Sequence, residues 1–336
     1  MDNEPRRLPD DVRPDDDQPA APSLPQISPP SPTNIFRNER GLRAGWRILI
    51  YILIVMLFST ALNLALDKIF HLPKTSSPAP GQMLLVEFLL FLVVWLPACL
   101  MAWIEHRYVS DYGLPLASAF GKLFWQGCAL GVAEIVALMG CIAVFHGYSF
   151  GSLNIHGAAI FKWAIFWGIF FIVVGLFEEF AFRGYLQFTL ADGIGFWPAA
   201  WILSLSFGAV HLMNTGESPV GALSVAVIGI IFAFTLRRTG NLWFLVGWHA
   251  AFDCGETFLF SVPNSGNVFE GHLSNATLHG PVWLTGGSVG PEGSVFSFIT
   301  MAAAALFIHK VFPASSYREP SPVASHHPVN PAATSQ

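Results

Sequence analysis

Long apolar stretches run through most of this chain, and they constrain its fold more than any other feature. A helix that crosses a membrane needs roughly 20 apolar residues. We predict a helical span for each of eight stretches: about 46–66, 83–104, 122–146, 158–188, 196–213, 219–236, 241–261 and 294–312. The fourth stretch is too long for one straight span. The fifth is short, so its depth in a membrane stays open.

The composition indicates lipid rather than water as the solvent around these stretches. Hydrophobic residues make up 53% of the 336 residues and charged residues only 12%, whereas a soluble domain usually carries about 25% charged residues. In lipid the backbone must satisfy its own hydrogen bonds, and a helix does so within one segment. We therefore predict an all-α fold, a polytopic membrane bundle of about eight transmembrane helices.

Both ends of the chain differ from this apolar middle. Residues 1–40 are rich in Pro and Asp, and residues 313–336 are rich in Pro, Ser and Ala. Such composition is typical of disordered, solvated tails. We therefore expect one transmembrane domain over residues 41–312, flanked by two tails.

The basic residues predict how the bundle is oriented. Short loops that carry Lys and Arg usually face the cytoplasm. Such residues precede the first span and follow the sixth: Arg37, Arg40, Arg43, Arg47, Arg237 and Arg238. We therefore expect an integral, multi-pass protein of the plasma (inner) membrane with both termini in the cytoplasm.

One loop stands out between the last two predicted spans. Residues 262–293 are rich in Gly, Pro, Ser and Asn and include VPNSG, GPVWLTGG and GPEGS. On the predicted topology this loop lies outside. Its length suits a cap or a re-entrant element, but it suits an ordinary connector equally well.

Ionisable residues gather in the apolar spans of the second half of the chain. Each such residue is costly in lipid, so a function is the first hypothesis to consider. Because they would be unstable without partners, we expect them to converge on one place. The fourth, fifth and seventh spans supply them: Glu178, Glu179, Arg183, His211, His249, Asp253 and Glu256.

The stretch LFEEFAFRG carries the first group. Glu179 and Arg183 are four residues apart, hence on one helical face, and can neutralise each other. Glu178 lies about 100° around the same helix and is left over. A carboxylate in this setting can take a proton from water as a general base. The alternative is a buried ion pair that only holds helices together.

The stretches FGAVH and HAAFD carry the histidines. His211 alone would more often be a packed, hydrogen-bonded side chain than a catalyst. His249 and Asp253 are four residues apart, which places both side chains on one face. That pair is either an imidazole oriented by a carboxylate or part of a metal site.

Together, EEFAFR, FGAVH and HAAFD resemble the EExxxR, FxxxH and HxxxN/D motifs of the CPBP family, also called the ABI or CAAX protease self-immunity family. This family includes the type II CAAX prenyl endopeptidases. The order and approximate separations match, and the motif core covers about residues 158–261. The resemblance implies an intramembrane glutamic endopeptidase and a transmembrane protease domain over 41–312.

The resemblance also implies roles for individual residues. Glu178 would activate a water molecule with help from His211, and His249 would bind the oxyanion. Glu179 and Arg183 would support the site. Asp253 stands where the prenyl proteases often have Asn, so it is either protonated or orients His249.

We therefore predict a hydrolase that cleaves a peptide bond without a cofactor. Its expected partners are the lipid bilayer and a membrane-associated peptide or protein, which is lipidated for the eukaryotic members of the family. Nucleic acid is not expected, because the chain has no basic patch.

Two alternative functions stay open at this stage. The first is a zinc-dependent membrane metalloprotease with Glu178, His211 and His249 as ligands. The second is a non-enzymatic membrane scaffold, an immunity protein or a transporter, because intramembrane carboxylates and histidines also serve proton relays.

Overall fold

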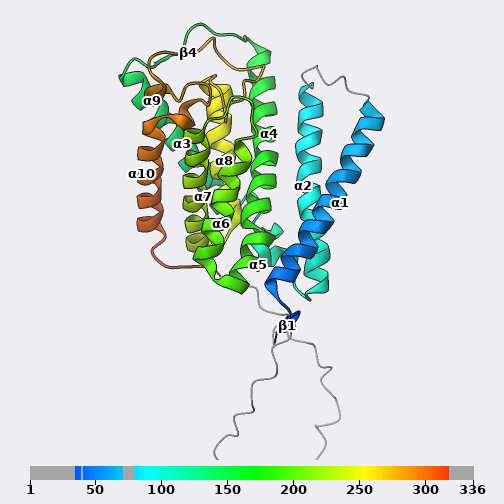
Figure 1. Cartoon of the computed structure of the whole chain (residues 1–336). Helices are drawn as coiled ribbons and strands as arrows, with labels where there is room; N and C mark the ends of the chain where they lie inside the picture. The colour runs from blue at the N-terminus through cyan, green and yellow to red at the C-terminus, as the bar shows by residue number, and fades with distance from the viewer. Residues whose placement is uncertain (1–34, 39–40, 71–78, 318–336) are drawn as a thin grey trace, which may run out of the picture.

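The computed structural model describes residues 35–38, 41–70 and 79–317. They form a bundle of helices packed side by side, joined to two short antiparallel strand pairs (Figure 1). The predicted all-α bundle is therefore confirmed. The helices are α1 (Ala44–Phe70), α2 (Pro80–Ile104), α3 (Lys122–Val144), α4 (Ala158–Arg183), α5 (Tyr185–Ile194), α6 (Phe196–His211), α7 (Pro219–Thr239), α8 (Leu242–Cys254), α9 (Val282–Thr285) and α10 (Val295–Val311).

Short elements connect these helices. The strands are β1 (Arg37–Asn38), β2 (Gly41–Leu42), β3 (Tyr148–Ser149) and β4 (Thr277–Leu278). Three 3₁₀ turns are η1 (Val109–Tyr112), η2 (Leu116–Ser118) and η4 (Pro291–Gly293), and η3 (Gly255–Leu259) is a π-turn that continues α8.

All eight predicted stretches form helices, but their lengths differ. Within the described residues, five segments are long and apolar enough to cross a membrane: α1, α2, α3, α4 together with α5, and α7. The remaining three, α6, α8 and α10, have 16, 13 and 17 residues. The chain is an integral membrane protein, and the number of eight spans stays a prediction.

The stretch 158–188, too long for one straight span, is divided at Gly184. The φ and ψ of Gly184 are −82° and −125°, which is not helical, and α5 starts at the next residue. A Cβ atom at this position would lie 2.4 Å from the carbonyl oxygen of Phe180. Only glycine fits this close turn, so the chain leaves the axis of α4 directly after Arg183.

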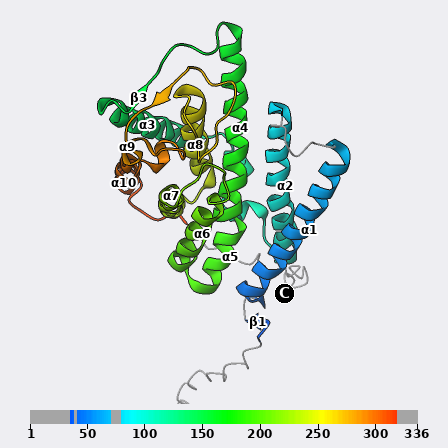
Figure 2. The same cartoon turned by 45° about the horizontal axis from the view of Figure 1, so that its top comes forward.

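The short helix α8 lies in the centre of the bundle, between α3 and α4 (Figure 2). Its contact with α3 depends on glycine. A Cβ atom at Gly127 or Gly131 of α3 would lie 2.0 or 2.3 Å from backbone oxygens of α8, and one at Gly247 would lie 2.2 Å from a backbone oxygen of α3. Small residues let membrane helices approach this closely.

The outermost helix, α1, is fastened to the bundle by buried charges. Arg47, which is 6% exposed, forms ion pairs with Glu105 after α2 and with Asp192 of α5. Arg107 reaches the same Asp192 carboxylate at 3.1 Å. Two arginines and two carboxylates thus neutralise each other where α1 meets α2 and α5.

Residues 262–293, called the cap below, cover one end of the bundle. Figure 1 shows β4 and α9 of this segment at the upper end of the bundle, opposite β1. Strand β4 of the cap pairs with β3, which follows α3, and residues of the cap line an internal cavity. The loop is therefore a cap and not an ordinary connector.

The two predicted tails lie almost wholly outside the described residues. Of the first, only residues 35–38 are described, and of the second only 313–317. The backbone amides of Ser316 and Tyr317 donate to the carbonyl of Arg237 at the end of α7. β1 and the end of α10 lie at the same end of the bundle (Figure 1), and the side of the membrane that they face stays a prediction.

The α3–α8 contact can be tested at two glycines of the same helix. Gly131→Ala should lower the free energy of unfolding by about 1–3 kcal/mol, because the added methyl group overpacks the contact. Gly140→Ala is the matched control, since nothing lies within 4 Å of its Cβ position. Thermal unfolding in detergent should show a lower melting temperature for the first variant alone. An equal melting temperature for both variants would contradict the close approach.

Candidate active site

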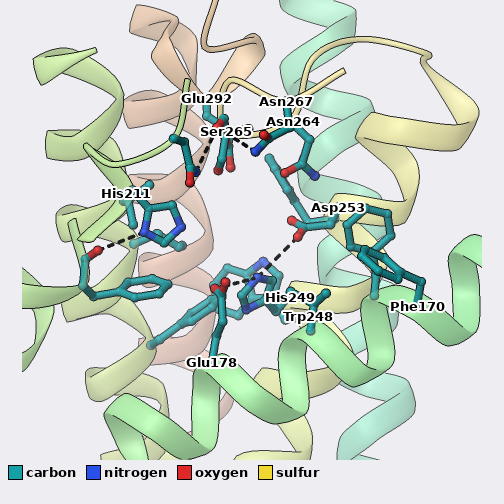
Figure 3. Close-up of a pocket in the computed structure, with 18 of the residues that line it drawn as sticks. Phe170, Glu178, His211, Trp248, His249, Asp253, Asn264, Ser265, Asn267 and Glu292 are labelled. Atoms are coloured by element: carbon teal, nitrogen blue, oxygen red, sulfur yellow. Dashed lines mark hydrogen bonds and ion pairs between the residues drawn. The ribbon is translucent and has the colours of Figure 1, made fainter. Parts of the chain in front are cut away.

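A cavity of about 230 Å³ lies inside the bundle, and all four residues predicted to be catalytic line it. Glu178 comes from α4, His211 from the end of α6, and His249 and Asp253 from α8. Figure 3 shows them around an open centre, with Glu178 and His249 at the bottom and His211 and Asp253 on opposite sides. The expected convergence of polar residues from separate helices is therefore found.

His249 is the centre of the polar network. Its Nδ1 lies 2.9 Å from Oε1 of Glu179, and its Nε2 lies 3.7 Å from Glu178 and 3.4 Å from Asp253. A carboxylate only accepts hydrogen bonds, so Nδ1 carries a proton that it donates to Glu179. The other nitrogen, Nε2, is thereby presented to the cavity.

The two neighbouring glutamates have different environments. Glu179 is fully buried and lies 3.5 Å from Nη1 of Arg183, so the predicted i, i+4 pair exists. The Glu178 side chain is 22% exposed and faces the cavity. Glu179 is thus committed to Arg183 and His249, while Glu178 stays accessible to a water molecule or a ligand.

Arg183 is held by rings as well as by a carboxylate. Its guanidinium carbon lies 4.3 Å from the ring centroid of Phe207 and 5.7 Å from that of Phe232. A Cβ atom at Gly229 would lie 2.7 Å from its Nη2. An arginine in a dry site gains from contact with aromatic faces. The guanidinium group therefore links α4 to α6 and α7.

The spacing of Phe207 and His211 has a physical reason. Nδ1 of His211 donates to the carbonyl oxygen of Phe207 at 2.9 Å, one helical turn back. This bond leaves Nε2 of the neutral ring as an acceptor. Phe207 thus sets the tautomer of His211 with its backbone while its ring covers Arg183.

The cap contributes polar residues that the sequence did not reveal. Asn264, Ser265, Asn267 and Glu292 line the cavity opposite Glu178 (Figure 3). The amide and hydroxyl of Ser265 both donate to Oε2 of Glu292 at 2.8 Å. Burial raises the pKa of Glu292 to about 7, and the nearby Asp253 carboxylate acts in the same direction. No periodicity or motif marks these cap residues.

Two further carboxylates of the cavity could have been found from the sequence. Glu87 of α2 and Glu134 of α3 both line it, and both lie within long apolar helices, where a charged residue calls for explanation. Glu134 accepts a hydrogen bond of 2.6 Å from the indole of Trp248. It therefore holds the residue next to His249.

The alternative zinc ligands do not form a compact site. Within the described residues, one group of at least three ligand atoms lies within 4.8 Å of one another, and it consists of Asp253, Glu256 and Glu292. Both nitrogens of His249 face carboxylates, and Nδ1 of His211 is bound to a backbone carbonyl. The set Glu178, His211 and His249 is not such a group among the described residues, and whether the site needs a metal stays a prediction.

Fold and site together define an integral membrane protein, a polytopic helical bundle that encloses a cavity lined by carboxylates and imidazoles. Residues 160–255 match the family described as type II CAAX prenyl endopeptidase Rce1-like. This segment is therefore similar to the Rce1-like endopeptidases, as the three motifs predicted, and the similarity supports a membrane endopeptidase. Comparison with curated proteins and with solved structures finds no match.

The different environments of the two glutamates predict different losses of stability when each is replaced by Gln. Glu179→Gln should lower the free energy of unfolding by roughly 3–5 kcal/mol, because it leaves the buried Arg183 charge without a counter-charge. Glu178→Gln should change it by less than about 1 kcal/mol, since that side chain faces the cavity. Melting temperatures in one detergent would check this. Equal stability of the two variants would show that Arg183 does not depend on Glu179.

Proposed function

We propose that this protein is an intramembrane endopeptidase that uses a water molecule activated by Glu178. The observation that carries the proposal is the convergence of Glu178, His211 and His249 from three helices on one cavity. A hydrolase needs a base for water, a donor for the oxyanion and an acid for the leaving amine. These three side chains supply groups of the required kinds.

The reaction proceeds in two steps in this proposal. A water molecule lies between Glu178 and Nε2 of His211. The Glu178 carboxylate takes a proton from this water molecule while the water oxygen bonds to the peptide carbonyl carbon. The oxyanion that forms is stabilised by the Nε2–H of His249, which in this proposal is an imidazolium with a proton on each ring nitrogen. The carbon–nitrogen bond then breaks, and protonated Glu178 or His211 donates the proton to the leaving amine. No covalent bond to the protein forms.

Asp253 serves as a positioning residue for His249 in this mechanism. Its Oδ2 lies 3.4 Å from Nε2 of His249, while Glu179 holds the opposite nitrogen at 2.9 Å. Two carboxylates on the two sides of one imidazole restrict its rotation and balance a positive charge on it. This favours the orienting role over a direct contact of Asp253 with the oxyanion.

The walls of the cavity support a substrate from the membrane. Apolar rings from α4, α8 and the cap lie beside the polar groups, including Phe170, Phe171, Phe252 and Phe269. Such a mixed cavity suits a peptide with apolar side chains or a lipid attachment near the cleaved bond. We propose a membrane-associated peptide or protein as the substrate, and the plasma membrane, with both termini cytoplasmic, as the location.

Loss of the base should abolish cleavage without loss of the fold. Glu178→Gln should reduce turnover at least about 10²-fold, because general-base catalysis contributes roughly that much or more. Peptides from cells that express the wild type or the variant, compared by proteomics, would reveal both substrate and activity. Glu270→Gln is the matched control, an exposed glutamate of the cap, and should leave the peptide pattern as in the wild type.

The same experiment separates the proposal from its alternatives. A folded Glu178→Gln protein that still cleaves would contradict the assigned base. A biological effect that persists in this variant would favour a scaffold, an immunity protein or a transporter. Stoichiometric zinc that is required for turnover would favour the metalloprotease.

A further inference from the structure

Three carboxylates meet beside the candidate active site, at the point where the cap touches α8. Asp253 lies in the last turn of α8, Glu256 lies in the π-turn η3, and Glu292 lies in the 3₁₀ turn η4 of the cap. One carboxylate oxygen from each lies within 4.8 Å of the other two. Asp253 is 7% exposed and Glu256 is fully buried. Three like charges this close repel each other strongly in a dry site.

Glu256 has no interaction that explains its burial. Both oxygens of its carboxylate are inaccessible to solvent and have no hydrogen-bond donor in the described part of the chain. A buried polar side chain is normally hydrogen-bonded, and an exception calls for an unseen ion or water molecule. The side chain lies beside the cap, since a Cβ atom built at Gly290 would be at van der Waals distance, 3.4 Å, from its Oε1.

The neighbouring charges do not compensate this group. Near the cavity, the ion pairs of the described residues join Arg183 to Glu179, and His249 to Glu178, Glu179 and Asp253. None of these pairs includes Glu256 or Glu292. Ser265 occupies only Oε2 of Glu292, with two hydrogen bonds of 2.8 Å, which leaves its other oxygen available.

We propose that Asp253, Glu256 and Glu292 together bind one Ca²⁺ ion. All three ligands are oxygen atoms, which hard divalent cations prefer, and none is the nitrogen or sulfur that zinc sites usually contain. Ca²⁺–oxygen bonds of 2.3–2.6 Å place opposite ligands up to about 5 Å apart. The separation of up to 4.8 Å between these oxygens fits that sphere.

The ion joins the cap to the catalytic helix. Glu292 comes from the cap, whereas Asp253 and Glu256 come from α8 and its π-turn, so a bound cation holds the two segments together. Asp253 is also the carboxylate that lies 3.4 Å from His249. Glu178 and His211 do not belong to this group of three ligands, and the proposal does not depend on the peptidase activity.

Direct binding is the first test. The full chain in detergent is first treated with EDTA, which is then removed by dialysis. The protein is next equilibrated with radioactive ⁴⁵Ca²⁺. We expect one Ca²⁺ per chain with a dissociation constant on the order of 10⁻⁵–10⁻³ M. Glu256→Gln and Glu292→Gln should each weaken binding at least about tenfold. Glu270→Gln and Glu178→Gln should bind as the wild type does, because neither residue belongs to the triad.

Thermal unfolding is the second readout, and it separates a cation site from a purely structural role. Ca²⁺ should raise the melting temperature of the wild type and of Glu270→Gln, but not that of Glu256→Gln. Without Ca²⁺, Glu256→Gln should be at least as stable as the wild type, because one of three repelling charges is removed. A purely structural Glu256 would give a less stable variant instead.

Three results would overturn the proposal. The first is a folded wild-type protein that binds no Ca²⁺ at millimolar concentration. The second is unchanged Ca²⁺ binding in both triad variants. The third is preferential binding of Zn²⁺ over Ca²⁺ that is retained in Glu256→Gln and lost in Glu178→Gln, since it would place the metal at the alternative ligand set.

A parallel titration with Mg²⁺ is expected to show weaker binding, because its shorter bonds fit closer ligands.

Discussion

The buried guanidinium of Arg183 is the group on which the arrangement of the site depends. A full charge in this dry environment requires a counter-charge, which Glu179 supplies at 3.5 Å. Glu179 in turn accepts from Nδ1 of His249, and so sets which nitrogen of that imidazole faces the cavity. The rings of Phe207 and Phe232 enclose the same guanidinium. One ion pair thus ties α4 to α6, α7 and α8.

Helix packing adds a second constraint on the same residues. Glycines of α3 let the backbone of α8 come close enough for Glu134 to accept from the indole of Trp248 at 2.6 Å. Since Trp248 precedes His249 in α8, this contact helps to fix the position of the imidazole. Electrostatics from α4 and close packing from α3 therefore act together on one short helix.

The cavity that results has many more acidic groups than basic ones. Glu178, Asp253 and Glu292 face it, and Glu256 lies beside Asp253 and Glu292. In a water-poor site each of these charges is felt strongly by the others. Histidines balance the carboxylates near α4, and in our proposal a cation balances the carboxylates near the cap. This division explains how one cavity can hold so many carboxylates.

The sequence by itself determined the helices and the polar residues that converge. In lipid the backbone must form its own hydrogen bonds, which favours helices, and a charged side chain is unstable there without a partner. The spacing of Glu179 and Arg183 was likewise enough to predict their pairing. Only the tertiary structure decided which carboxylate each nitrogen of His249 contacts, and that Glu292, 39 residues after Asp253 along the chain, lies next to it. Such contacts depend on the path of an irregular loop, which no periodicity encodes.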